Sequence, residues 1–477
     1  MPTVGPVMVA ADPQMRGRQA AVPASLAARL GLSAGELLLT AGSAQAAAAA
    51  VVAPDPPGDG PPALRLGPEL LHQLRVPDGT RLHARWLASS RTLALGPFVG
   101  ILALRSRRGV RYGEHEPFFR GLTRMGSKVG IPAYMFGPRD VDWNRRRVYG
   151  YTWSGAGPAR RWRRTVYPLP DVVYDRVQTR RAELRPKFAA FRERLSRSVP
   201  AWFNQTGFFD KWRMHVELAK SERLRRYLPD TALYGGPRDL ERFLAAYRTV
   251  YLKPVGGSLG LGIVRVQRTP AGFVAAHQPG ETLLVHRAAS VRALGRIVAR
   301  LTRRGPYIIQ QGLPLARWRG RPFDVRILMQ RTTGGAWALT KMFSRIAAPG
   351  RFTANLTRGG QGCRIGLLLR RVYGRRHGAL LKALRDAGFE LAREIERTVP
   401  GTVGELGLDL GLDRRGRIWL IEVNSKPFLQ MTREAGSART LSLSVQRPLR
   451  FAKFLAGFDE ERSDHVPSGA RHLDDVS

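Results

Sequence analysis

Residues 405–424 have the sequence ELGLDLGLDRRGRIWLIEVN, which is two apolar runs on either side of a basic turn. The alternation of apolar with small or polar residues predicts the two strands of a β-hairpin. If residues 414–417 form the turn, Asp409 lies directly opposite Glu422, and Asn424 shares the face of Glu422. Facing carboxylates repel unless a cation joins them, and three oxygen ligands suit Mg²⁺. The hairpin therefore predicts a metal site of these three side chains; the alternative is a solvated face with ordinary charges.

An upstream segment places a glycine-rich loop between two strand patterns. Residues 250–266 are VYLKPVGGSLGLGIVRV. Glycines let a backbone approach a phosphate and expose its N–H groups, and a Lys adds a point charge for the same oxygens. A Walker loop would open a helix, whereas β-branched residues after this loop indicate a strand. We give equal weight to an ordinary hairpin and to a phosphate-binding loop, whose residues would be Lys253, Gly256, Gly257, Ser258, Gly260 and Gly262.

Three cations lie at alternating positions of strands that are otherwise mostly apolar. Arg326 follows Phe-Asp-Val in residues 323–328, and Lys341 and Arg345 lie within residues 339–345. Inward-facing cations need anions, and a triphosphate or an acyl phosphate would supply them. Each segment by itself could instead provide a surface ion-pair partner.

The composition is that of a folded and strongly basic protein. The 477 residues include 43% hydrophobic residues, which excludes wholesale disorder, and 78 Lys+Arg against 37 Asp+Glu give a net charge of +41. The single Cys363 excludes an internal disulfide and a zinc ribbon. The longest apolar runs, residues 46–53 and 98–104, fall short of the ~18 residues of a membrane span. Because the amino terminus also lacks a signal-peptide pattern, we expect a soluble, cytoplasmic protein with no transmembrane segment.

Part of the excess charge is concentrated at residues 141–198, which hold 15 basic and 5 acidic residues interleaved with Trp and Tyr. This pattern predicts a basic face that docks onto a polyanion, such as an acidic protein or polymer. Codon bias toward Arg in a GC-rich genome explains the same charge without a partner, and we weigh the two equally. We do not expect direct binding of nucleic acid, because the chain has no recognised nucleic-acid module.

The chain divides into four parts by composition and hydrophobic period. Residues 1–92 form an N-terminal leader module, with helix patterns at 24–30 and 68–74 and a strand at 81–86. Residues 93–200 predict a small Rossmann-like α/β domain, in which strands at 98–104, 132–136 and 171–176 accompany a helix at 116–129. Residues 201–458 hold the chemistry described above, with helices at 210–228 and 378–398, and residues 459–477 are a polar tail that we expect to fray.

The segment from Asp210 to Pro427 resembles an ATP-grasp domain, close to the branch of ribosomal-protein glutamate ligase and glutathione synthetase. The early Lys of that pattern matches Lys211 in Asp-Lys-Trp, and its second nucleotide Lys matches Lys253. The strand that receives adenine matches residues 307–313, so the resemblance implies nucleotide contacts from Gln310, Gln311 and Leu313. It further implies roles for the Asp-x-Arg pair Asp324 and Arg326, for the phosphate-segment residues Arg345 and Asn355, and for the metal ligands Asp409, Glu422 and Asn424.

The wider stretch 93–455 is similar to the YheC/YheD family of endospore coat-associated ATP-grasp proteins. The segments that carry the resemblance are Phe-Phe-Asp-Lys-Trp (208–212), Leu-Pro-Asp-Thr (228–231), Asn-Ser-Lys-Pro (424–427) and Pro-Asp-Val-Val-Tyr-Asp-Arg (170–176). The resemblance implies an α/β protein in which the leader module and a Rossmann-like pre-ATP-grasp domain precede a two-lobed ATP-grasp domain at 201–458. Lys426 departs from the ligase branch, which has a small residue there, and this cation could alter the acceptor site.

The resemblance implies a protein that binds Mg-ATP in the cytoplasm of the mother cell and is associated with the spore coat. Its expected activity is that of a carboxylate–amine ligase acting through an acyl phosphate, with Arg326 and Arg345 as catalytic residues and with carboxylate and amine substrates that stay unidentified. Its expected macromolecular partner is an acidic coat protein or polymer. The alternative is a non-catalytic, ATP-binding component of the coat.

Overall fold

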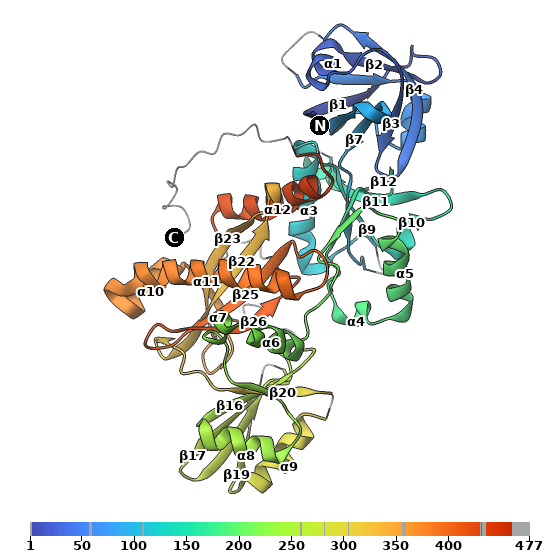
Figure 1. Ribbon diagram of the computed structural model, residues 1–477. Helices are drawn as coiled ribbons and strands as arrows, with labels where there is room; N and C mark the ends of the chain where they lie inside the picture. Colours follow the sequence, from blue (N-terminus) through green and yellow to red (C-terminus); the bar gives the residue numbers. More distant parts are fainter. Residues whose placement is uncertain are drawn as a thin grey trace.

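The computed structural model describes residues 2–56, 60–106, 109–155, 157–257, 260–280, 282–303, 305–354, 359–429, 431 and 436–459. It is elongated, with four sheets placed one after another along the molecule (Figure 1). Within these residues, none of the helices combines the length and the apolar character needed to cross a membrane.

The first sheet is a closed barrel of seven strands at one end of the molecule (Figure 1). Its two helices, α1 (Ala24–Leu30) and α2 (Pro68–Leu74), lie where the sequence predicts them. The barrel itself is not apparent from the sequence, because seven of the ten residues of its strand β4 (Ala44–Ala53) are Ala, a helix former. The strands follow the order β1 (Thr3–Ala11), β5 (Ala63–Leu66), β2 (Gln19–Pro23), β4 (Ala44–Ala53), β3 (Gly35–Ala41), β7 (Thr92–Gly96) and β6 (Thr80–Leu87).

The second sheet confirms the predicted parallel α/β arrangement. The strands β9 (Ala133–Phe136), β8 (Val99–Leu102), β13 (Val172–Asp175) and β14 (Ala201–Phe203) pair in parallel. The predicted helix is α3 (Glu116–Lys128). An antiparallel hairpin extends the sheet beyond these strands. The hairpin and its neighbours are β10 (Val141–Asp142), β11 (Arg147–Ser154), β12 (Arg161–Pro168), α4 (Arg180–Glu183) and α5 (Pro186–Ser196).

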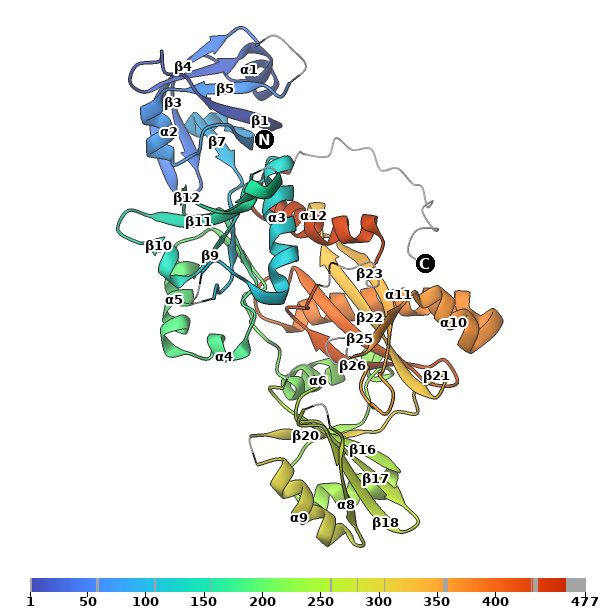
Figure 2. The same ribbon diagram turned by 180° about the vertical axis from the view of Figure 1, so that it is seen from behind.

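The third sheet forms the far end of the molecule, and helices α8 (Pro237–Ala246) and α9 (Val291–Leu301) cover it (Figure 2). Two short helices lead into it where the sequence predicts one helix, because Ser221 is extended between them. They are α6 (Lys211–Lys220) and α7 (Glu222–Arg225). The sheet runs β15 (Thr231–Leu233), β20 (Tyr307–Gln311), β16 (Thr249–Pro254), β17 (Val264–Thr269), β18 (Gly272–His277) and β19 (Leu284–Ala288), with α8 (Pro237–Ala246) and α9 (Val291–Leu301).

The fourth sheet lies between the second and the third (Figure 1). Its core packs against α11 (His377–Thr398), which confirms the predicted amphipathic helix. The last helix of the described residues, α12 (Ala438–Leu455), returns to the second sheet and packs against α3. The other elements are β24 (Gln361–Cys363), β23 (Trp337–Ile346), β22 (Arg321–Arg331), β25 (Glu405–Leu412), β26 (Ile418–Asn424), β21 (Arg317–Trp318) and α10 (Ile365–Tyr373).

Candidate active site

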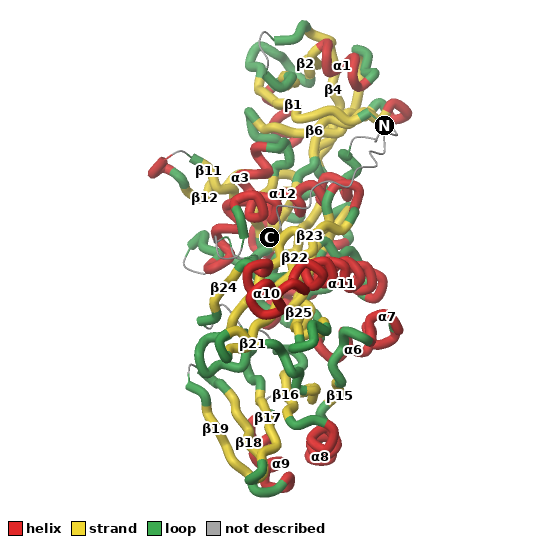
Figure 3. The backbone as a smooth tube through the Cα atoms, turned by 90° about the vertical axis from the view of Figure 1, so that its left-hand side faces the viewer, coloured by secondary structure: helices red, strands yellow, loops and turns green. Residues whose placement is uncertain are grey.

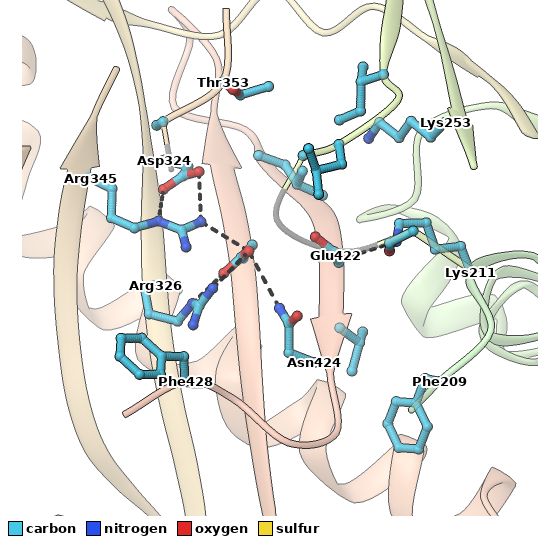
Figure 4. Close-up of a pocket in the computed structure, with 18 of the residues that line it drawn as sticks. Phe209, Lys211, Lys253, Asp324, Arg326, Arg345, Thr353, Glu422, Asn424 and Phe428 are labelled. Atoms are coloured by element: carbon cyan, nitrogen blue, oxygen red, sulfur yellow. Dashed lines mark hydrogen bonds and ion pairs between the residues drawn. The ribbon is translucent and has the colours of Figure 1, made fainter. Parts of the chain in front are cut away.

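A cavity of about 360 Å³ opens where the third and fourth sheets meet the α/β domain. The third sheet contributes residues of β16 and β20, and the fourth contributes residues of β22, β23, β25 and β26. The α/β domain closes one end with Glu114, His115 and Arg180. Segments far apart in the sequence thus supply one cavity that is rich in both signs of charge (Figure 4).

The residue pairs at this cavity are the predicted ones, but the hairpin near the turn is shifted by one residue. Leu412 pairs with Ile418, so the turn spans 413–417 instead of 414–417, and a register shift between Asp409 and Leu410 restores the predicted pairs. Asp409 of β25 pairs directly with Glu422 of β26, and Gly407 pairs with Asn424. The Nδ2 of Asn424 lies 3.5 Å from Oδ2 of Asp409, which leaves its carbonyl oxygen as the possible ligand atom. The two carboxylates and the amide form a set of hard oxygen donors that fits Mg²⁺. The metal role of the three residues stays a prediction.

The carboxylates are neutralised by side-chain cations of the chain itself. Nε of Arg326 lies 2.5 Å from Oδ1 of Asp409, and Nη2 of Arg345 lies 2.9 Å from its Oδ2. Arg345 also holds Asp324, with Nε 2.7 Å from Oδ1 (Figure 4). On the other side, Nζ of Lys211 lies 2.8 Å from Oε1 of Glu422. Among the described residues, no three His, Cys, Asp or Glu side chains cluster closely enough to hold a metal ion.

Burial and charge act oppositely on the two aspartates of this network. Burial raises the pKa of Asp409, but the neighbouring Arg326 and Arg345 outweigh it and hold that pKa below the usual value. At Asp324 burial outweighs Arg345, so its pKa is raised. Arg345 itself has a raised pKa because its two carboxylate partners outweigh the effect of burial. The network is therefore a rigid, charged wall of the cavity.

The predicted phosphate loop is a hairpin loop that borders the cavity. It joins the antiparallel strands β16 and β17, and Gly257 and Gly260 line the cavity, whereas Gly256 and Gly262 do not. Gly262 has a positive φ of 73°, and a Cβ there would come within 2.9 Å of Pro254, so the close approach of the loop to β16 requires glycine. Ser258, and Asn355 of the phosphate segment, lie outside the described residues.

The two lysines implicated in nucleotide binding both line the cavity. Lys253 projects from β16, and its Nζ donates to Oε1 of Gln310 at 2.5 Å. Burial lowers the pKa of Lys253 to about 8. Lys211 begins α6 and donates to the carbonyl of Gly257 as well as to Glu422. An anion between the two ammonium groups would regain the stabilisation that burial removes.

Of the remaining predicted residues, Gln310, Gln311 and Leu313 line the cavity and Lys341 does not. Lys341 lies four residues from Arg345 on the same strand, which is about 13 Å of β-strand. Its Cδ lies 3.6 Å from the Cβ position of Gly436, just before α12. The expectation that three cations share one anion site therefore fails for Lys341, because strand length separates it from the cavity.

Lys426 is the residue whose surroundings the sequence could not indicate. Its Nζ lies 2.5 Å from both Oδ1 of Asp175 and Oε1 of Glu183, and its side chain is 2% exposed. The cation is thus neutralised by the α/β domain, although Lys426 also lines the cavity. Next to it, Nη2 of Arg176 donates to the carbonyl of Pro427 at 2.9 Å.

Arg176 also forms a fully buried ion pair with Glu405, the first residue of β25. Tyr174 and Asn204 donate to the same carboxylate at 2.7 and 3.2 Å. The sequence motif at 170–176 was recognisable, but nothing in it indicated a partner more than 200 residues away. Together the two ion-pair clusters fix the strand end that carries Asn424 against the α/β domain.

Comparison with known proteins gives four similarities. A family model described as YheC/D-like ATP-grasp matches residues 200–455. The endospore coat-associated protein YheD of Bacillus subtilis (strain 168) is 27% identical over 398 residues, covering 82% of this chain and 85% of YheD. YheC of the same organism is 23% identical over 318 residues, covering 66% of this chain and 86% of YheC. The crystal structure of D-cycloserine synthetase DcsG matches with a TM-score of 0.45 and 17% identity, covering 75% of this chain and 99% of that one.

Proposed function

We propose that this chain, which belongs to the YheC/D-like ATP-grasp family, is an ATP-dependent carboxylate–amine ligase. The observation that carries the proposal is one cavity lined by two lysines, Lys211 and Lys253, and by two carboxylates, Asp409 and Glu422. Phosphates need cations and a magnesium ion needs carboxylates, so Mg-ATP satisfies both kinds of charge together. In this proposal residues 1–92, 93–200 and 201–458 are the leader, pre-ATP-grasp and ATP-grasp domains.

The nucleotide would lie along the cavity from β20 to the wall formed by β22 and β25. Gln310, Gln311 and Leu313 would receive the base, and Lys253 and Lys211 would hold phosphates, with N–H groups of the loop beside them. Gln310 already accepts a hydrogen bond from Lys253, so a residue that would bind the base is connected directly to one that would bind the phosphates. Binding would require Lys211 to exchange Glu422 for a phosphate oxygen, which frees that carboxylate.

Asp409, Glu422 and Asn424 would hold Mg²⁺, which neutralises charge on the transferring phosphoryl group when bound. The oxygen of a substrate carboxylate attacks the γ-phosphorus, ADP leaves, and an acyl phosphate forms. An amine then attacks the acyl carbon, inorganic phosphate leaves, and the amine loses a proton. Arg326 and Arg345 are held by carboxylates before any substrate binds, so their donors are pre-positioned for the charge that develops.

The acceptor would enter at the end of the cavity formed by the α/β domain. Glu114 could attract an ammonium group there, and Arg180 a carboxylate. His115 is neutral at this end, because burial and the nearby Arg176 lower its pKa to about 3. It stacks beside Phe119 and meets Phe428 edge to face, so it serves as an apolar wall.

A second candidate is a non-catalytic ATP-binding component of the spore coat, located in the mother cell. It is favoured by the names of the two relatives and by the complete pairing of Arg326 and Arg345 inside the chain. The test is ADP release by purified protein with Mg-ATP and a panel of amino acids and acidic peptides. Turnover with any acceptor supports the ligase, whereas tight ATP binding without turnover across the panel supports the coat component.

A further inference from the structure

Residues 143–170 contain seven Arg and no acidic residue or Lys. They include the β11–β12 hairpin, which projects sideways from the second sheet, away from the cavity (Figures 2 and 3). The ligase proposal assigns no role to this hairpin, although its two strands pair along the whole length of β12.

One face of the hairpin is a stack of aromatic rings and guanidinium groups. Tyr149, Tyr151 and Trp153 share this face, and Trp153 pairs across the ladder with Trp162. Arg164 lies 3.9 Å from the ring centre of Tyr149, and Arg120 of α3 lies 3.7 Å from that of Trp153. An isolated two-stranded hairpin is marginally stable, and the contact of Arg120 with Trp153 attaches this one to α3. Guanidinium groups cover the faces of Tyr149 and Trp153, so these faces are not available to stack on nucleobases.

The opposite face and the outer edge of β12 are open at its first residues, whereas Tyr167 and Pro168 at its end are buried. Arg161 and Arg163 are exposed and share that face, opposite Ser154 and Thr152. All eight residues of β12 pair with β11, and among the described residues no other strand pairs with β12. A strand at the edge of a sheet directs a row of backbone N–H and C=O groups outward. The edge therefore offers both backbone hydrogen bonds and two aligned cations.

We propose that β12 binds an acidic peptide segment of a protein partner by strand addition. Residues two apart on a strand lie about 7 Å apart on one face, so carboxylates at alternate positions of an added strand would face Arg161 and Arg163. Opposite charges on neighbouring strands attract, and the backbone ladder holds the peptide in register. This goes beyond the ligase proposal and does not depend on it.

The test uses the full chain and a fluorescein-labelled ten-residue peptide of alternating Glu and Thr, with binding followed by anisotropy. We expect Arg161→Glu with Arg163→Glu to weaken binding at least tenfold, and the Gln versions to weaken it less. The matched control is Arg292→Glu with Arg296→Glu, the same charge change at two exposed positions of α9, which should alter binding less than twofold. All variants should melt at the temperature of the unchanged protein.

Two further probes separate strand addition from simple charge attraction. The same peptide with N-methyl groups on alternate backbone nitrogens keeps its carboxylates but loses hydrogen bonds, and we expect at least tenfold weaker binding. Equal binding of both peptides would overturn strand addition. Equal losses for the β12 and α9 variants would overturn the location, and tighter, β12-dependent binding of a ten-nucleotide single strand would identify a nucleic acid as the partner instead of an acidic peptide.

Discussion

Replacement of Lys253 by Met should weaken nucleotide binding and stabilise the nucleotide-free protein. The side chain keeps a similar length, but the only ammonium group on β16 is lost. A hydrogen bond to a charged group is worth about 1.5–3 kcal/mol, so the Kd for Mg-ATP should rise about 10- to 100-fold.

The stabilisation follows from the lowered pKa of Lys253. Burial takes that pKa from 10.5 to about 8, which corresponds to about 3 kcal/mol of unfavourable free energy while the amine is charged in the folded state. Met removes this cost and also the hydrogen bond to Gln310, worth about 1 kcal/mol. The net expectation is a rise of about 1–2 kcal/mol in the free energy of unfolding.

The pH dependence distinguishes this explanation from a packing effect. Below about pH 8 the amine is protonated in both the folded and the unfolded chain, so the cost is complete. Between about pH 8 and pH 10.5 the folded protein loses the proton first, so the advantage of the Met variant shrinks as pH rises.

Titration calorimetry with Mg-ATP and urea unfolding at pH 7 and pH 9.5 measure both effects. Lys220→Met is the matched control, because Lys220 is 67% exposed on α6 and pairs only with its neighbour Glu217. It should leave the affinity within twofold and the stability within about 0.5 kcal/mol. Unchanged affinity in Lys253→Met would refute the placement of phosphates, and an advantage that does not shrink with pH would refute the electrostatic cause.

Three other changes probe the site and its supports. Glu422→Gln should abolish the Mg²⁺-dependent rise in melting temperature that ATP produces, whereas Glu217→Gln should keep it; equal losses would mean that other carboxylates bind the metal. Glu405→Gln should lower the free energy of unfolding by about 3–5 kcal/mol, since it leaves the buried Arg176 without its counter-charge, and an unchanged urea midpoint would contradict that pairing. Lys426→Met should raise the Kd for Mg-ATP at least threefold through the displaced Asn424, and normal affinity in a destabilised protein would reduce Lys426 to a structural role.

The pairing at the site was predictable from local sequence, but the rest of the hairpin was not. Asp409 faces Glu422 as expected because two departures cancel: the turn has one residue more than predicted, and a register shift next to Asp409 compensates for it. The identity of their counter-ions could not be predicted, because Arg326 and Lys211 come from segments about 80 and 210 residues upstream. The facing carboxylates predicted a metal ion, and that stays a prediction. In the structure Asp409 pairs with Arg326 and Arg345, and Glu422 pairs with Lys211.

Other features were hidden because tertiary contacts outweigh local propensity. Ala46, Ala48 and Ala50 point into the barrel, where small side chains fit its interior, although an Ala run predicts a helix. Lys341 and Arg345 are four residues apart on β23, so alternation predicts that they face the same side. Lys341 nevertheless lies beside Gly436, just before α12, and does not line the cavity. Alternation predicts the face of a residue, and it does not predict how far the cavity extends.

The buried pair of Arg176 and Glu405 has a consequence for where the protein can be divided. The family match begins at residue 200, yet Glu405 is neutralised by a residue that precedes this boundary. A fragment of residues 200–455 would keep a carboxylate on a newly exposed apolar surface, beside Phe203 and Phe451 of the shared core. We therefore expect the matched segment not to fold by itself, so the parts of the protein before and after residue 200 have to be produced as one chain.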